Sequence, residues 1–462
     1  MAEVELPLIP LTEADAEDDS RHELEDIQSI LGVEECVRYY PPNLAEVPDP
    51  AAVFAPDPAL PPGREIDLFV DVPYCGTICG FCPFNVYPYE ESEANAYLTA
   101  LGQEVAILAG LYDLRSTRLR TVWIGGGTPS TLDEAALERL MGMLAGHFDL
   151  AAATEVTVEI KPQLKDLTEA KFAVLRDHGV TRISMGVQSV HPHQLRTLGR
   201  GHTAEEAYQV IDLVRGLGFP VNVDMIYRLP GETLAEVEAD LDAMRGRGIE
   251  HMSWFPYVPH EGTSLARRID RGRVARPGTR AEYFAMYSAV RERLAASGYH
   301  GYTPYHFGLD GRPCEYHVDR WRMPQRETLG IGPGAFSFFN GHIYANEHSP
   351  ARYAAAVAAG RAPVQKAKRL TETERITRLA VLGVKFLSLD MDEFHRVSGV
   401  RMEEYYAEEL ALLERAGLVV RREGRLECTL AGEAFNNDIA TILSTDTAAR
   451  TRHPQAIDLM RS

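Results

Sequence analysis

The chain has 462 residues, of which 45% are hydrophobic and 25% are charged. This length and composition predict two or three folded domains and exclude disorder throughout the chain. The formal net charge of −20 argues against nucleic acid and anionic membrane surfaces as partners, because phosphate groups are bound by clustered Lys and Arg.

Residues 1–63 are expected to form an acidic and proline-rich N-terminal extension. Residues 1–30 contain ten acidic residues and one basic residue, so they carry −9 of the net charge and are typical of a solvated tail. Residues 41–63 are rich in proline and predict an extended arm. The sequence has no 18-residue apolar run, no secretory signal and no disulfide-like cysteine pattern, so no membrane span and a cytoplasmic location are expected.

Short apolar runs alternate with helical patterns over residues 64–300, which predicts parallel strands joined by helices. The expected strands are 66–72, 121–124, 155–160, 182–187, 221–227 and 252–258, and the expected helices lie near 93–112, 132–146, 168–178, 203–217 and 233–247. Because the strands read as nearly continuous apolar runs, helices are expected to cover the sheet. Six such units fit a partial (β/α)6 TIM-like barrel or an open doubly wound sheet, and in both folds ligands bind where strands end.

The alternation stops after residue 258. Residues 301–365 are expected to form a linker region that contains the glycine-rich stretch LGIGPGAFSFF at 329–339. Residues 366–462 are helical and charged, and the helix–strand–turn–strand pattern at 413–435 predicts a small α+β winged-helix-like C-terminal domain. A structural role for this domain is favoured over DNA binding, because the chain is acidic.

Half of the chain's six cysteines, Cys75, Cys79 and Cys82, fall within eight residues directly after the first expected strand. Three thiolates on one loop can bind iron, and a [4Fe–4S] cluster held by three cysteines keeps one iron open for a small molecule. Zinc is the alternative metal, but structural zinc sites use four ligands and no fourth Cys or His lies nearby in the sequence. The C-x3-C-x2-C spacing therefore favours an iron–sulfur cluster over zinc and over buried structural thiols.

This loop and the motifs that follow it resemble the radical S-adenosylmethionine (SAM) superfamily. From about residue 64 onward, the chain is similar to the subgroup of oxygen-independent coproporphyrinogen III dehydrogenase. The resemblance implies a partial barrel and a [4Fe–4S] cluster whose open iron is chelated by the amino and carboxylate groups of SAM. It further implies cleavage of SAM to a 5′-deoxyadenosyl radical, a small-molecule substrate and an external one-electron donor such as flavodoxin or ferredoxin. A monomer is expected.

The resemblance also assigns residues to SAM. Phe81 is expected near the adenine, the turn GGGTP at 125–129 along the methionine group, and Glu159 near the amino group or the ribose. An arginine such as Arg200 suits a carboxylate and an acid such as Asp224 suits ribose hydroxyls, although the first could be a surface charge and the second a capping acid. The full set for this first site is Phe81, Gly125, Gly126, Gly127, Thr128, Glu159, Gln188, Arg200 and Asp224.

A second SAM is implied beside the first. In the resembled subgroup the segment LGIGPGA at 329–335 contributes to this second site, together with Gly127 and Ile226. The residues that it would contribute here are Ile331, Gly332 and Gly334. The alternative is a tight turn that joins the core to the C-terminal domain.

The chain departs from the coproporphyrinogen enzyme at three positions near the cluster. Phe69 stands where that enzyme has a tyrosine, Asp71 where it has a histidine, and Phe84 where it has a further cysteine. These changes favour SAM-dependent C-methylation or cyclopropanation at an sp2 carbon of an aromatic or heteroaromatic substrate. Two alternatives stay open: radical chemistry on a tetrapyrrole, by decarboxylation or haem ring opening, and a haem chaperone without turnover.

Overall fold

The computed structural model describes residues 44–47, 50–54, 65–112, 114, 117–323 and 326–444. The expected acidic tail and most of the proline-rich arm lie outside these ranges. The described parts of the arm are β1 (Ala45–Glu46) and the 3-10 helix η2 (Pro50–Phe54). β1 pairs with the sheet edge, and Phe54 packs edge-on against Tyr112 and Tyr344, so these parts of the arm lie against the barrel.

Six parallel strands form the barrel wall, and they lie side by side in the order of the sequence. They are β2 (Glu65–Val72), β5 (Arg118–Gly126), β6 (Glu155–Ile160), β7 (Arg182–Gln188), β8 (Val221–Tyr227) and β9 (His251–Pro256). A doubly wound sheet would reverse its strand order at a switch point, and these six strands do not. The fold is therefore the partial barrel, and all six predicted strands are confirmed to within three residues.

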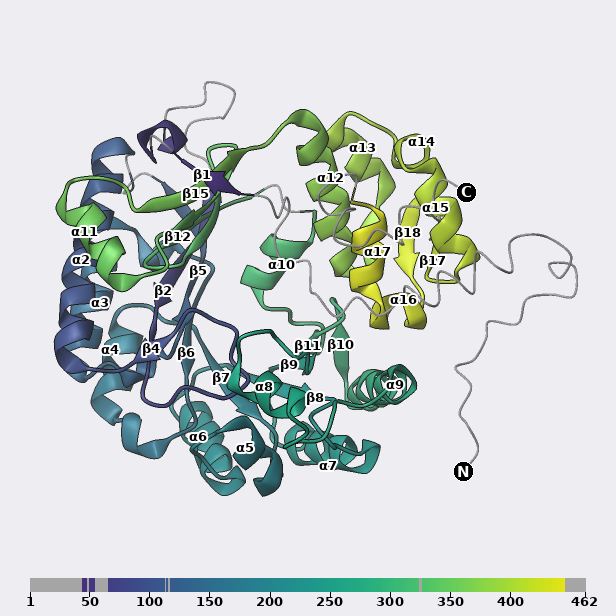
Figure 1. Ribbon diagram of the computed structural model, residues 1–462, viewed down its shortest axis with the longest axis horizontal. Helices are drawn as coiled ribbons and strands as arrows, with labels where there is room; N and C mark the ends of the chain where they lie inside the picture. Colours follow the sequence, from purple (N-terminus) through teal and green to yellow (C-terminus); the bar gives the residue numbers. More distant parts are fainter. Residues whose placement is uncertain are drawn as a thin grey trace, which may run out of the picture.

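Helices cover the outer face of these strands, as Figure 1 shows. They are α2 (Glu91–Leu111), α3 (Glu134–His147), α4 (Glu169–Asp177), α5 (Pro192–Leu198), α6 (Ala204–Gly216) and α7 (Leu234–Arg245). Four of them begin at a side chain that accepts a backbone N–H of the first turn, which satisfies an otherwise unpaired donor. These caps are Asp133, Thr168, Thr203 and Thr233.

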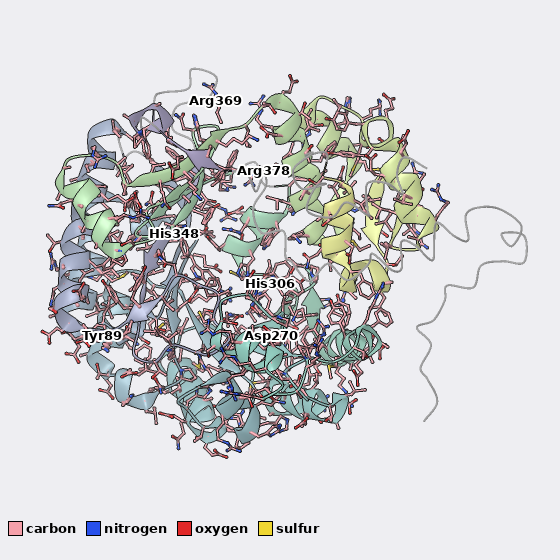
Figure 2. The ribbon with its side chains drawn as sticks, viewed as in Figure 1. Tyr89, Asp270, His306, His348, Arg369 and Arg378 are labelled. Carbon is pink, nitrogen blue, oxygen red and sulfur yellow. The ribbon has the colours of Figure 1, made fainter. Side chains whose placement is uncertain are left out.

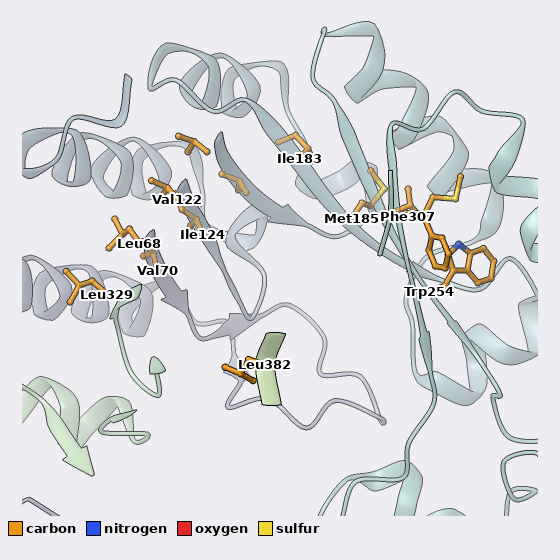
Figure 3. Packing of buried hydrophobic residues seen from close by; sticks show 14 of the residues in the cluster. Leu68, Val70, Val122, Ile124, Ile183, Met185, Trp254, Phe307, Leu329 and Leu382 are labelled. Carbon is orange, nitrogen blue, oxygen red and sulfur yellow. The ribbon is translucent and has the colours of Figure 1, made fainter. Parts of the chain in front are cut away.

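The strands are not continuously apolar, which corrects the sequence-based expectation. Outward positions such as Leu68, Val122 and Ile183 are fully buried against the helices and form the main core (Figure 3). Inward positions alternate with them and are mostly polar, among them Asp67, Thr121, Glu155, Thr157, Ser184, Asn222, Asp224 and His251. The inward side chains bond one another across strands, as Thr121 Oγ1 does to Asp67 Oδ1 at 2.5 Å. Apolar and polar residues alternate because successive side chains of a strand point to opposite faces of the sheet and the helices cover only one of these faces.

Residues 301–365, expected as a linker, contribute strands to the same sheet. β12 (Glu327–Ile331) lies parallel to β2, and β13 (Phe336–Phe339), β14 (His342–Asn346) and β15 (Val364–Arg369) continue the sheet beyond it. At the opposite edge β11 (His306–Leu309) pairs antiparallel with β9 and with β10 (Tyr299–Gly301). Helices α8 (Ser264–Asp270) and α9 (Arg280–Ala296) come between β9 and β10, and α10 (Glu315–Trp321) and α11 (Pro350–Ala358) lie within residues 301–365.

The C-terminal region is a small α+β unit beside the barrel (Figure 1). Its helices are α12 (Glu372–Gly383), α13 (Met391–Ser398), α14 (Met402–Tyr405), α15 (Ala407–Arg415), α16 (Leu430–Ala434) and α17 (Asn436–Ile442). β16 (Ser388–Asp390), β18 (Arg425–Cys428) and β17 (Val419–Arg422) form its three-stranded sheet. Arg291 Nε of α9 donates to Glu433 at 2.6 Å, which ties this unit to the barrel. Among the described residues, no helix is both long and apolar enough to span a membrane.

A buried carboxylate fastens the β12–β14 hairpins to the barrel. Glu104 of α2 is 2% exposed and accepts hydrogen bonds from Gly332 N–H at 2.8 Å, Asn346 Nδ2 at 2.7 Å and Tyr353 OH at 2.5 Å. Burial raises the pKa of Glu104 to about 7, and the three donors oppose that rise. One side chain thus joins a helix to the turn after β12, to β14 and to α11.

We expect Glu104→Ala to lower the free energy of unfolding by about 2–4 kcal/mol, because it leaves three buried donors without an acceptor. Chemical denaturation at pH 7 measures the change. Gln103→Ala, at the exposed neighbouring position, is the control and should change stability little. Equal stability of the two variants would contradict the proposed fastening role.

Candidate functional site

The cysteine loop lies at the carboxyl end of β2, where ligands bind in barrels of this kind. Cys75 is buried at the end of β3 (Tyr74–Cys75), and Cys79 and Cys82 are half-buried. Gly80 holds the loop in place, because its N–H donates to Leu198 O at 2.8 Å and its carbonyl accepts from Leu265 N–H at 2.8 Å. The loop is therefore anchored between the end of α5 and the start of α8.

Two cations lie around the three thiols. Burial raises the pKa of Cys75, and it raises the pKa of Cys82 to about 11; the positive charge of Lys161 opposes both shifts. Arg200 Nη1 donates to Cys79 Sγ at 3.4 Å, and Lys161 Nζ donates to Thr77 O at 2.5 Å. Because iron–sulfur clusters are held by thiolates, binding must displace the thiol protons, and neighbouring positive charges favour that step.

The donor set fits an iron–sulfur cluster. Three thiols on one loop are soft ligands, and in a four-iron cluster each thiolate binds a different iron, so the sulfurs need not converge on one point. No group of three or more His, Cys, Asp or Glu side chains among the described residues is arranged to hold a single metal ion. When bound, a cluster of this kind supplies the electron that cleaves SAM.

The glycine turn packs tightly against the cysteine loop. Gly127 N–H and Thr128 N–H donate to Val72 O and Tyr74 O, both at 2.8 Å, and a Cβ on Gly127 would lie 2.7 Å from each of these two oxygens. Gly126 has a φ of +97° and faces the carboxylate of Asp71. The fold therefore needs glycine at both positions, whether or not a ligand also approaches the turn.

Acidic side chains gather near the carboxyl ends of β2 and β6 and in the middle of β8. Trp123 Nε1 donates to Glu159 at 2.6 Å, and burial, opposed by this bond, raises the pKa of Glu159 to about 7. Burial also raises the pKa of Asp224 and raises that of Asp71 well above the usual value. The Asp224 carboxylate accepts a hydrogen bond from Asn222 Nδ2 at 2.8 Å. Oxygen acceptors thus line the mouth of the barrel, as binding of ribose hydroxyls or an amino group requires.

Arg200 is positioned for an anionic ligand. It follows α5 and Gly199, one of its terminal nitrogens donates to Gly186 O, and its Nε is buried without a hydrogen-bond partner. A buried N–H with no partner is costly, so a carboxylate here would satisfy it. Gln188 ends β7 with a φ of +76° and is almost fully buried nearby, with its amide facing Gly186.

The remaining predicted residues lie on two sides of the loop. Phe81 and Ile226 belong to one apolar cluster with Leu198 and Tyr257, which is the environment expected around an adenine ring. Ile331 is buried, and Gly332 and Gly334 have φ values of +100° and +82°. A Cβ on Gly332 would meet Asp71 O, and a Cβ on Gly334 would lie 3.0 Å from Asn85 Nδ2. The segment 329–335 therefore borders β2 and the cysteine loop.

Sequence reasoning assigned no role in this site to Trp123, Lys161 or Asp71, and it named Asp71 only as a departure from the coproporphyrinogen enzyme. Trp123 and Asp71 occupy inward positions of β5 and β2, and Lys161 directly follows β6. Their places at the ends of predicted strands were a usable signal. Their contacts with Glu159, the cysteine loop and Gly126 depend on strands that are distant in the sequence.

We expect Cys75→Ala, Cys79→Ala and Cys82→Ala each to lose the cluster. Anaerobic reconstitution of the unmodified chain should give about four irons and four sulfides per chain with brown absorbance. Cys428→Ala, in the C-terminal unit, should reconstitute normally and serves as the control. Full iron content in Cys75→Ala would show that the ligand assignment is wrong.

We expect Arg200→Met to keep the cluster but to weaken SAM binding by about tenfold or more, because a charge-assisted bond to a carboxylate is lost. Equilibrium dialysis of SAM against the reconstituted protein measures the affinity. Arg196→Met changes an exposed arginine of the preceding helix α5 and should bind SAM normally. If Arg200→Met is insoluble, the arginine serves the fold; if its SAM affinity is unchanged, Arg200 does not bind SAM.

Comparison with known families agrees with this geometry. The family model of the Radical SAM superfamily matches residues 69–244, and the model of the HemN C-terminal domain matches residues 370–435. The solved structure of coproporphyrinogen III oxidase (HemN) from Escherichia coli, a radical SAM enzyme, superposes with a TM-score of 0.74 at 24% identity. The superposition covers 85% of this chain and 92% of that one, which shows the shared fold.

Two curated relatives match most of the chain. The haem chaperone HemW of Mycobacterium tuberculosis is 32% identical over 382 residues, which cover 81% of this chain and 96% of the relative. HemW of Bacillus subtilis is 27% identical over 374 residues, which cover 80% of this chain and 97% of the relative. With the cysteine loop, the partial barrel and the C-terminal unit in place, this chain belongs to the HemN- and HemW-like family of radical SAM proteins.

Proposed function

We propose that this chain is a haem-binding protein of the haem-chaperone type, which holds a [4Fe–4S] cluster and SAM at the barrel mouth. The observation that carries the proposal is the near full-length similarity to HemW of Mycobacterium tuberculosis, which is named a haem chaperone. C-methylation and cyclopropanation, favoured from the sequence, find no support in the three proteins compared above, which are named haem chaperones or coproporphyrinogen III oxidase.

A cluster of histidines inside the barrel supports haem binding. The rings of His306 and His317 lie 3.9 Å apart, and the ring of His251 lies 6.1 and 6.0 Å from them. Burial lowers the pKa of His306 to about 3 and holds the pKa values of His251 and His317 well below the usual range. All three imidazoles are therefore neutral near pH 7, which is the form that ligates haem iron.

His317 is the best candidate among them for an iron ligand. Both ring nitrogens of His251 have partners, Asn222 Oδ1 at 2.6 Å and Tyr302 OH at 2.7 Å, and His306 Nδ1 lies 2.6 Å from Thr303 Oγ1. Within the described ranges neither His306 nor His317 has a hydrogen bond at Nε2, and the side chain of His317 is less buried than those of His251 and His306. Its ring lies 5.2 Å from that of Trp123, which bonds Glu159 in the SAM site.

One SAM is proposed at Glu159, Arg200 and Asp224. A second SAM beside Ile331, Gly332 and Gly334 stays a prediction. The fold already accounts for both glycines, because Gly332 meets Asp71 and Gly334 meets Asn85 and His348. The need for glycine there is thus no independent support for a second ligand.

We expect the chain to bind haem about stoichiometrically and His317→Ala to weaken binding by at least about tenfold, with a changed Soret band, because an iron ligand is lost. Anaerobic haem titration followed by absorbance measures both effects. His300→Ala removes an exposed histidine of β10 and should bind as the unmodified chain does.

Product analysis distinguishes the alternatives. The reconstituted protein with SAM and reductant should not methylate an acceptor in the presence of haem. If haem does not bind, the proposal is wrong. Formation of S-adenosylhomocysteine together with 5′-deoxyadenosine would instead point to methylene transfer.

A further inference from the structure

A pocket lies between the barrel and the C-terminal unit, away from the cluster loop. Side chains of α10, β12–β14 and α12 line it, chiefly Asp319, Arg320, Arg326, Ser337, Phe338 and Arg378. The empty space between them is about 420 Å3, part of which is open to solvent. Three arginines face one carboxylate here, which is unusual in a chain with a net charge of −20.

Arg378 is the least compensated of these charges. Its side chain is 8% exposed, its Nε is buried without a hydrogen-bond partner, and no ion pair links it to any described residue. Its guanidinium lies over the ring of Phe338 at 4.3 Å. Burial, together with the like charge of Arg320, lowers the pKa of Arg378 to about 9. A buried cation without a counter-charge is strongly unfavourable, so a bound anion at this position would stabilise Arg378.

The acids nearby do not supply that anion. Asp319 already lies 3.4 Å from Arg326 Nε and 3.6 Å from Arg120 Nε, and Glu65 accepts from Arg326 Nη1 at 2.6 Å. The carboxylates at this edge of the barrel are thus shared among Arg326, Arg120 and Arg118. Figure 2 places Arg378 where the barrel meets the C-terminal helices.

The pocket also adjoins the proposed haem ligand. Arg320 and His317 are three residues apart on α10, which places them on neighbouring turns of one helix face. Arg320 Nη1 donates to Tyr316 OH at 3.3 Å, and the rings of Tyr316 and His317 lie 6.1 Å apart. A haem bound near His317 carries two carboxylates on an apolar ring, and guanidinium groups match carboxylates in both charge and shape.

We propose that this pocket binds a propionate carboxylate of haem, with Arg378 and Arg320 as its cationic partners. The inference rests on the proposed haem binding. The carboxylate supplies the counter-charge that Arg378 lacks, and the C-terminal unit, through α12, takes part in the ligand site. The C-terminal unit then has a role in ligand binding in addition to a structural one.

The test compares haem with haem dimethyl ester, in which both carboxylates are esterified, by absorbance titration in the same detergent. The unmodified chain should bind haem about tenfold to a hundredfold more tightly than the ester, because charge-assisted bonds are lost. Arg378→Gln should bind haem as weakly as the unmodified chain binds the ester, with its affinity for the ester unchanged. Arg375→Gln, at an exposed position on the same helix, should keep the preference for haem.

Each other outcome is decisive. Equal affinity of the unmodified chain for haem and ester overturns the propionate site but leaves haem binding intact. If Arg378→Gln still binds haem more tightly than the ester, residues other than Arg378 bind the carboxylates. Binding of neither compound overturns the proposed function and this inference together. Because the ester comparison uses the unmodified chain, it holds even if Arg378→Gln does not fold.

Discussion

The rest of the structure depends on the two-residue alternation of side chains in six parallel strands. Helices cover only the outer face of these strands, so the outward side chains form the apolar core and the inward side chains are free to be polar. Inward polar groups need partners, and neighbouring strands supply them, as with Trp123 and Glu159 or Asn222 and Asp224. The polar barrel interior is therefore a consequence of how the sheet is covered, and it is where ligands can bind.

The electrostatic design of the site follows from this enclosure. Burial disfavours charge, so carboxylates such as Asp71 and thiols such as Cys82 are held with raised pKa values. Lys161, which follows β6, and Arg200, which follows α5, supply positive charge beside the cysteine loop. An anionic cluster and a ligand carboxylate complement these cations.

The segment between β9 and the C-terminal unit joins the barrel to the rest of the chain. β11 extends the sheet at one edge and β12 at the other, while α10 brings His317 toward the barrel interior and Arg320 toward α12. The same short helix thus contacts both the histidine cluster and the arginine pocket. The proposed roles of barrel and C-terminal unit are linked through it.

The sequence by itself determined the six strands, the main helices and the cysteine loop, because these depend on local periodicity, capping residues and spacing within a few residues. Together with the family resemblance, it also pointed to Glu159 and Asp224, which lie in predicted strands, and to Arg200, which follows α5. It did not reveal the inward polar face, the joining of residues 301–365 to the sheet, or the contacts of Trp123 and Lys161. Those depend on pairing between strands that are far apart in the chain. Only the tertiary structure placed Arg378 beside Arg320, because burial of a charge is decided by which distant surfaces meet around it.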